Sequence, residues 1–404
     1  MKILILHNQY KHAGGEDETV IDEARLLRSR GHGVVEYVLH NDAIDGLSRR
    51  ELAAATLWNR RSYAEIRAIL GTERPDVVHA HNLFPLISPA AYYAAAAEGV
   101  PVVQSLHNYR LVCVGGMLSR QGRPCEDCAS HLLPWPGVWH ACYRDRAHSA
   151  AIAAMLSLHR ALGTWRREVH AFVTLTEFAR SKFIMNGFAE DKLVVKPNFV
   201  ADDPGIGCGD GEYALYVGRL SPEKGLQTLL NAWKGIGRSC ELVVVGDGPL
   251  RGASQEVPEG VSFRGQLPRA EVYALMRRAK VVIVPSEVYE TFGRVVIEAF
   301  ASGAPVIAAD IGALAELVGH GRTGFLFAPG SAADLKRQVV SLLSDPARAA
   351  TMRKAARAEY QMRYTAEANY RILMAIYEKA RGAARLGRAG PRRAAGAPAG
   401  RPMS

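Results

Sequence analysis

The sequence contains no hydrophobic run that could cross a membrane as a helix. None of its apolar stretches approaches the roughly 18 uninterrupted residues that such a span requires. The apolar start, MKILIL, is interrupted at His7, and we do not interpret it as an export signal. We therefore expect a cytoplasmic protein.

The chain also lacks the pattern of a nucleic-acid-binding protein, despite a formal charge of +10. Residues 381–404 contain six arginines and no acidic residue, so about +4 remains on the rest of the chain. That remainder shows no interleaving of basic and aromatic residues on which bases could stack. We predict no nucleic-acid partner.

The end of the chain, residues 384–404, is rich in Gly, Ala and Pro and is predicted to be disordered. This segment either keeps the protein soluble or is weakly attracted to anionic lipid.

What the sequence does contain is typical of a soluble globular protein, with 48% hydrophobic and 22% charged residues. Short β-rich apolar runs alternate with amphipathic helical patterns, which predicts parallel sheets covered by helices on both faces. The alternation occurs twice, so we predict two doubly wound Rossmann-like α/β domains. The predicted strands are residues 2–6, 33–39, 76–80, 101–106 and 171–175, and then 213–218, 241–246, 261–265, 280–285 and 305–309.

The domain boundaries follow from where this alternation stops. A first domain is predicted at 1–200 and a second at 213–363, separated by the linker 201–212, which is rich in Gly, Pro and Asp. The helical pattern at 364–383 is predicted as a last helix. Because ligands of open α/β sheets bind beyond the carboxyl ends of the strands, the cleft between the domains is the expected site.

In the first domain, three short segments follow predicted strands. Gly14 and Gly15 precede a helix and would let backbone amides approach a phosphate or a sugar, although the G-x-G-x-x-G dinucleotide pattern is absent and a plain turn fits equally well. His79 and His81 share one strand face and could bind a metal, but no carboxylate stands near them in the sequence. His107 opens a third polar segment.

In the second domain, GRLSPEKG places Arg219 and Lys224 after a strand, where they could hold a diphosphate. Glu290 and Glu298 are eight residues apart. A continuous helix would separate them by on the order of 12 Å along its axis, too far to share one scissile bond. We instead predict a helix that begins near Gly293, with its anion-binding N-terminus between the two carboxylates. This arrangement suits a nucleoside-diphosphate sugar.

These motifs, together with GAPVIAAD, GALAELV and GRTGFLF, resemble the family 4 retaining glycosyltransferases of the GT-B fold, over residues 1 to about 380. The resemblance implies a nucleotide-sugar donor held mainly by the second domain and a glycan or lipid-linked acceptor held mainly by the first. It implies a place in cell-surface polysaccharide biosynthesis and peripheral contact with the cytoplasmic membrane face. The alternatives are a nucleotide-sugar-binding protein without transfer activity, or a phosphorylase or epimerase of the same fold.

The resemblance also assigns roles to single residues. Glu298 would bind the ribose, Glu290 the hydroxyls of the donor sugar, and His107 the sugar near the reacting carbon. The diphosphate would be held by Arg219, Lys224 and the amides of Phe292 and Gly293, while Gly15 would approach the phosphate or the acceptor. The family needs no catalytic metal ion, since the leaving diphosphate assists front-face attack. No Asp-x-Asp motif stands in the cleft loops. The predicted last helix would cross back onto the first domain.

The sequence departs from the family pattern in two places. Phe199, in PNFV, stands where many relatives carry glycine, so it receives no role. The second departure is an insert at 108–145, which contains Cys113, Cys125, Cys128 and Cys142. A disulfide framework is not expected in a cytoplasmic chain, so these residues are either ligands of a structural zinc ion or buried thiols. Cys208 and Cys240 are unrelated to this group.

Overall fold

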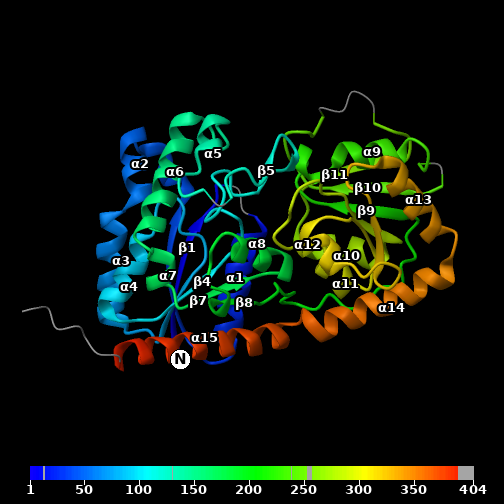
Figure 1. Cartoon of the computed structure of the whole chain (residues 1–404). Coiled ribbons are helices and arrows are strands. Elements are labelled where there is room, and N and C mark those ends of the chain that lie inside the picture. The colour runs from blue at the N-terminus through cyan, green and yellow to red at the C-terminus, as the bar shows by residue number, and fades with distance from the viewer. Residues whose placement is uncertain (12–13, 130, 238, 253–256, 390–404) are drawn as a thin grey trace, which may run out of the picture.

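The computed structural model describes residues 1–11, 14–129, 131–237, 239–252 and 257–389. Figure 1 shows two α/β domains side by side, with α14 (Pro346–Arg363) along the lower side of the second domain and α15 (Ala366–Ala389) along the lower side of the first. Each domain contains a parallel six-stranded sheet, in the orders β2-β1-β3-β4-β7-β8 and β11-β10-β9-β12-β13-β14. The predicted fold class, two doubly wound Rossmann-like domains, is confirmed.

The four inner strands of the first sheet are almost entirely buried, as expected for a parallel sheet covered on both faces, whereas its two edge strands, β2 and β8, are partly exposed. Its strands are β1 (Lys2–Gln9), β2 (Gly33–His40), β3 (Val77–Ala80), β4 (Val102–Ser105), β7 (Ala171–Thr174) and β8 (Leu193–Val195). Its helices are α1 (Gly15–Ser29), η1 (Asn41–Gly46), α2 (Arg49–Leu57), α3 (Arg60–Glu73), α4 (Ala90–Glu98), α6 (Arg146–Ala161), α7 (Thr164–Glu168), α8 (Glu177–Met185) and η2 (Glu190–Lys192).

The second sheet repeats this architecture. Its strands are β9 (Tyr213–Val217), β10 (Glu241–Val245), β11 (Val261–Gly265), β12 (Val281–Val284), β13 (Val306–Ala309) and β14 (Gly324–Phe327). Its helices are η3 (Pro222–Lys224), α9 (Leu226–Trp233), α10 (Arg269–Arg278), α11 (Arg294–Ala301), α12 (Gly312–Leu317), α13 (Ala332–Leu343) and α14 (Pro346–Arg363).

All ten predicted strands are present, and each six-stranded sheet has one further strand, β8 or β14, that was not predicted. Both are edge strands of three or four residues. An edge strand pairs on one side only, and so short a strand contains too few residues for an apolar period to show. Sequence pattern alone therefore identified the centre of each sheet but not its last strand.

The last helix, α15 (Ala366–Ala389), is longer than predicted. It packs against β3, β4 and β7 and against α1, and Leu373, Ile376 and Tyr377 are buried in the core of the first domain. The prediction that disorder begins at residue 384 is wrong for 384–389, which continue the helix. The rest of the predicted tail, residues 390–404, lies outside the described residues. Within the described part of the chain, no helix is both long and apolar enough to span a bilayer.

The insert at 108–145 folds as a compact loop region with a two-stranded hairpin of β5 (Ser119–Arg120) and β6 (Arg123–Pro124) and one short helix, α5 (Trp135–Trp139). Helix α5 packs on α6, and α6 packs on α2. In Figure 1 these three helices lie at the end of the first domain opposite α15. The insert therefore sits at the carboxyl end of the first sheet, beside the expected site.

Candidate active site

The carboxyl ends of the two sheets meet in direct hydrogen bonds between the domains. The Thr291 hydroxyl donates to the His107 carbonyl at 2.7 Å, and the Tyr109 hydroxyl donates to the Glu290 carbonyl at 3.4 Å. The Glu316 carboxylate accepts from the backbone amides at the start of α8, at 3.0 and 2.8 Å. The structure thus brings the segment after β4 against the segment that carries Glu290.

Glu290 lies in the loop before α11, where two side chains hold its carboxylate. The Lys224 ammonium lies 2.5 Å from Oε1 of Glu290, and the Ser286 hydroxyl donates to the same oxygen at 2.8 Å. Burial alone would raise the pKa of Glu290, but the Lys224 charge and these hydrogen bonds outweigh it and lower that pKa below its usual value. Glu290 is therefore an ionised carboxylate that stays mostly enclosed, with its side chain 20% exposed.

Glu298 lies in the second turn of α11, as predicted, in a different electrostatic setting. Burial raises its pKa above the usual value, against the opposing charge of Arg294. Arg294 lies 3.4 Å from the Glu298 carboxylate and also 3.4 Å from that of Asp22 in the first domain. Arg269 adds ion pairs to Glu18 at 2.8 Å and to Asp22 at 3.2 Å. Glu298 therefore faces charges that bridge the two domains, and sequence reasoning did not anticipate these bridges.

The turn into α11 depends on Gly293. Its φ is +136°, and a Cβ at this position would lie 2.9 Å from Leu314. Only glycine accepts both constraints, so the chain can bend here and direct the first amides of α11 towards the cleft. Phe292, just before it, is buried at 3% exposure and packs in the core of the second domain.

Two further predicted residues lie at the same edge of the molecule. Arg219 follows β9 and is exposed. Gly15 begins α1, and its carbonyl accepts from Arg294 at 3.2 Å. A Cβ on Gly15 would lie 3.2 Å from the Arg294 side chain, so this glycine allows the second domain to approach closely.

His107 is held by a second histidine. Its Nε2 lies 2.9 Å from Nδ1 of His81, and the two rings stack with their centroids 5.2 Å apart. Burial lowers the pKa of His107 to about 3 and lowers that of His81 well below its usual value. Both rings are therefore neutral at physiological pH, and one of them donates the shared proton to the other.

Behind His81 lies a buried ionic group that the sequence did not reveal. Oε1 of Glu23 is 3.0 Å from His79 and 3.5 Å from His81, and Oε2 of Glu23 is 2.8 Å from the Lys196 ammonium. Burial opposes the Glu23 charge, but Lys196 and the histidines hold the pKa of Glu23 well below its usual value. The Tyr377 hydroxyl of α15 also contacts His79, at 2.8 Å.

This group changes the assessment of the two histidines. Within the described residues, Glu23, His79 and His81 form a buried group whose ligand atoms all lie within 4.8 Å of one another. Helix α1 therefore supplies the carboxylate that the sequence next to the two histidines lacks. Lys196 already neutralises that carboxylate, and a divalent ion would bring a second cation against it. We therefore interpret the group as a structural ion pair behind His107. The sequence did contain one indication that Glu23 is buried, because it lies on the same face of α1 as Val20, Ala24 and Leu27, all of which are buried.

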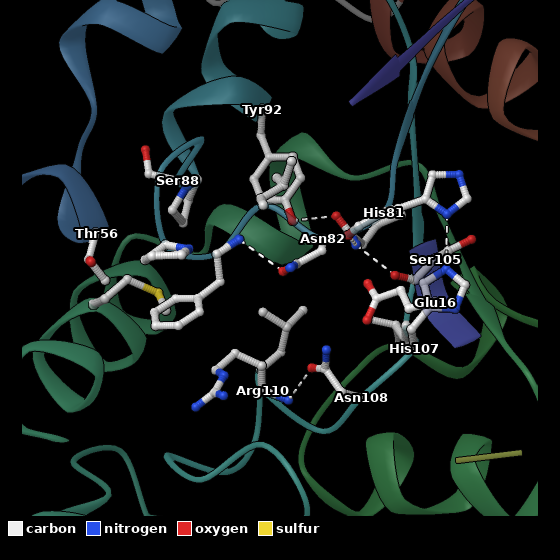
Figure 2. Close-up of a pocket in the computed structure, with 18 residues that line it drawn as sticks. Glu16, Thr56, His81, Asn82, Ser88, Tyr92, Ser105, His107, Asn108 and Arg110 are labelled. Atoms are coloured by element: carbon white, nitrogen blue, oxygen red, sulfur yellow. Dashed lines mark hydrogen bonds between the residues drawn. The ribbon is translucent and has the colours of Figure 1, made fainter. Parts of the chain in front are cut away.

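A pocket of about 50 Å³ opens in front of His107 on the first domain. Figure 2 shows Glu16, His107 and Asn108 on one side of it and Thr56 and Ser88 on the other. Burial raises the pKa of Glu16 to about 7, and its carboxylate accepts a hydrogen bond from Tyr10 at 2.9 Å. The pocket therefore offers several hydrogen-bonding groups of the kind that bind sugar hydroxyls.

The four cysteines of the insert are neighbours but do not form a closed metal site in this arrangement. Cys113 and Cys128 are buried, while Cys125 and Cys142 are partly exposed. The Cys113 sulfur and the Cys142 Cβ both lie within 4 Å of the point where a Cβ on Gly115 would stand. Among the described residues, however, no three of these sulfurs lie within 4.8 Å of one another. Burial, and then the neighbouring Cys113 thiol, raises the pKa of Cys128 to about 11.

The sequence matches two family profiles that together cover most of both domains. "Glycosyltransferase Family 4" matches residues 13–203 and "Glycosyl transferases group 1" matches residues 208–359. A glycogen synthase of Mycobacterium tuberculosis is 31% identical over 304 residues, which cover 71% of this chain and 66% of that protein. The phosphatidyl-myo-inositol mannosyltransferase of Mycobacterium leprae is 32% identical over 200 residues, 45% of this chain and 52% of that protein.

Among solved structures, Anabaena Alr3699/HepE in complex with UDP-glucose is similar along nearly the whole chain. Its TM-score is 0.66 at 22% identity, and the similarity covers 94% of this chain and all of that one. At this level of identity the likeness establishes the two-domain fold and leaves the ligand of this chain open.

Proposed function

Because the chain belongs to glycosyltransferase family 4, we propose that it transfers a sugar from a nucleotide-sugar donor to a glycan or lipid-linked acceptor, with retention of the anomeric configuration. The family and the glycosyltransferase class predicted from the motifs are confirmed by the two profiles and the relatives. The donor, the acceptor, the stereochemistry and the residue roles are parts of the proposal.

The observation that carries the proposal is the Lys224–Glu290 pair next to His107. Lys224 brings a cation and Glu290 a carboxylate to one point at the edge of the second sheet. The neighbouring Thr291 is hydrogen-bonded to the backbone of His107. A donor placed here would have its diphosphate beside the cation and its sugar between the carboxylate and the pocket of the first domain.

The other donor contacts follow from this placement. Arg219 would contact the diphosphate with Lys224, and the amides of Phe292 and Gly293 would add hydrogen bonds at the start of α11. Glu298, further along the helix, would accept from the ribose hydroxyls. His107 is neutral at physiological pH and would hydrogen-bond the sugar near the reacting carbon. UDP and UDP-glucose, the ligands of Anabaena HepE, are the first donors to test.

For the acceptor, we propose the pocket in front of His107, with Gly15 at its rim. The relative named as a phosphatidyl-myo-inositol mannosyltransferase supports a lipid-linked acceptor. A cytoplasmic place of action, with peripheral contact to the membrane surface, belongs to the same proposal, as does a role in cell-surface polysaccharide biosynthesis.

Thermal unfolding with a panel of UDP-, GDP- and ADP-sugars tests the proposed donor. We expect one nucleotide class to raise the melting temperature, since a ligand at 100 times its Kd adds about 2.7 kcal/mol to the stability. Release of nucleoside diphosphate should then require an added acceptor. A donor consumed only with orthophosphate would indicate a phosphorylase, and stabilisation by no nucleotide sugar would contradict the donor proposal.

Zinc content tests the insert. If the four thiols rearrange to converge on one ion, protein purified under reducing, chelator-free conditions should contain about one zinc per chain. Zinc bonds to sulfur at about 2.3 Å, so the sulfurs would have to move closer together than in the present arrangement. Elemental analysis measures the metal, and thiol titration gives a second reading, because the exposed Cys208 should react in the folded zinc form while the insert cysteines and the buried Cys240 should not. Protein that contains no zinc would identify the insert cysteines as thiols without a metal.

A further inference from the structure

A second cavity, of about 180 Å³, lies beside the acceptor pocket, between α2 and α6. Its walls are mostly apolar and include Leu52, Phe84 and Ile152. Arg49 and Arg50 line it as well and are exposed. We call this space the α2–α6 cavity. It combines an apolar interior with cationic groups, which suits an amphiphile that carries an anionic group.

The α2–α6 cavity is adjacent to the pocket in front of His107. Thr56, Phe84 and Pro85 line both spaces. The Arg110 guanidinium, which lines the pocket, lies 4.7 Å from the centre of the Phe84 ring and 4.9 Å from that of Tyr143, a cavity residue. The two spaces are thus adjacent, and a ligand that spanned both would have its sugar at His107 and its apolar part between α2 and α6.

The arginines around this cavity are poorly neutralised. Arg49 makes only a loose ion pair with Asp145, at 3.8 Å, and its side chain is 78% exposed. In the described part of the chain, Arg50, Arg144 and Arg146 have no carboxylate within ion-pair distance. Arg49 and Arg50, the two arginines that line the cavity, thus have little competition from carboxylates and favour a phosphate or diphosphate.

Helix α5, which packs on α6, and the loop before it carry large exposed apolar side chains. Leu132, Leu133, Trp135 and Trp139 are 55–64% exposed and lie on α5 and the loop before it. Arg146 lies 5.3 Å from the ring centre of Trp139. Tryptophan and leucine with arginine at their edge are typical of side chains that insert at the level of lipid headgroups. We call these four residues the α5 face.

We propose that the α2–α6 cavity binds the phosphate and the first part of the apolar chain of a lipid-linked acceptor, while the α5 face rests on the membrane that holds the rest of that chain. This inference rests on the proposed function, because it takes the acceptor sugar to lie at His107. It narrows the acceptor to an amphiphile with an anionic group between its sugar and its chain. The cavity, at about 180 Å³, is smaller than a typical small-molecule site, so most of a long chain would remain in the bilayer.

Dodecyl phosphate, used below its micelle-forming concentration, is the probe for the cavity, with dodecanol and inorganic phosphate as comparisons. Titration calorimetry should show binding of dodecyl phosphate that neither comparison matches. The double variant Arg49→Glu/Arg50→Glu should weaken this binding by about tenfold or more. The control Arg166→Glu/Arg167→Glu makes the same charge change on α7 and should leave the binding unchanged. Ala53→Trp, which fills the cavity, should also abolish binding while circular dichroism shows a folded protein.

Vesicles of phosphatidylcholine with phosphatidylglycerol are the probe for the α5 face. Trp135→Ala/Trp139→Ala should lose most co-sedimentation with these vesicles and still bind dodecyl phosphate. Met362→Ala, at another exposed apolar residue, is the control. Equal binding of dodecyl phosphate by the wild type and by Arg49→Glu/Arg50→Glu would overturn the inference. Self-association of the wild type through the α5 face, without vesicle binding, would also overturn it by identifying a protein interface.

Binding of the nucleoside diphosphate separates this inference from the proposed function. A protein that binds UDP or another nucleoside diphosphate, but not dodecyl phosphate, retains the donor proposal and loses the cavity assignment. A protein that binds dodecyl phosphate, but no nucleoside diphosphate, retains the cavity assignment and loses the donor proposal.

Discussion

Glu290→Ala is expected to lower kcat by about a hundredfold or more while leaving nucleoside-diphosphate binding nearly unchanged. The carboxylate would face the donor sugar, whose anomeric carbon gains positive charge in the transition state, so its contribution is larger there than in the ground state. In the structure Glu290 also holds Lys224 at 2.5 Å. Its removal frees that ammonium, which can then bind the diphosphate at least as well as before.

Glu298→Ala is the matched variant, since it removes a second carboxylate from the same segment. The ribose does not change during transfer, so this variant should chiefly raise the donor KM and weaken binding of the free nucleoside diphosphate. Glu290→Gln, which keeps the shape and loses the charge, should resemble Glu290→Ala in kcat. Steady-state kinetics and titration calorimetry with the nucleoside diphosphate separate the two positions. If Glu290→Ala abolished diphosphate binding while Glu298→Ala left it intact, the donor would lie in the opposite orientation.

Lys196→Met is expected to destabilise the first domain by about 3 to 5 kcal/mol, the usual effect of removing one partner of a buried ion pair. Lys196 and Glu23 have side chains 2% and 1% exposed, so water cannot replace the lost ammonium. The double variant Glu23→Leu/Lys196→Met should recover most of the loss, because it removes both charges and fills the site with apolar atoms. The shift of the urea midpoint measures each effect.

The pH dependence of this variant gives a second test with a definite sign. In the wild type the pKa of Glu23 is held below its usual value, so its contribution to stability is present above the pKa of the unfolded chain and is lost only in acid. Without Lys196 the carboxyl is buried without its main counter-charge, and its folded pKa rises instead. Its ionisation then opposes folding as the pH rises, so Lys196→Met should lie closer to the wild type at about pH 5 than at about pH 8. An equal loss at both values would mean that the pair contributes through packing rather than charge.

The residues at the cleft show how much of a site local sequence can reveal. Arg219, Lys224, Glu290 and His107 each lie in a segment that follows a strand, at the carboxyl edge of a sheet, and Glu298 lies in the second turn of the helix after Glu290. Local sequence patterns did not predict the contacts that these residues make. The Lys224–Glu290 pair joins residues 66 positions apart, and Thr291 reaches His107 across 184. Such distances along the chain depend on how the two domains pack, which no local pattern encodes.

The sequence alone was enough to predict ten of the strands, the repeat of one architecture in two domains and the sheet edge that carries the polar loops, because side-chain periodicity and turn residues act over a few positions along the chain. The folded molecule alone decided which charges meet. Glu23 and Lys196 neutralise each other across 173 residues, and Tyr377 of α15 completes the group behind His107. Parallel sheets bring distant segments together, and a buried charge is stable only where the folded chain places an opposite charge beside it.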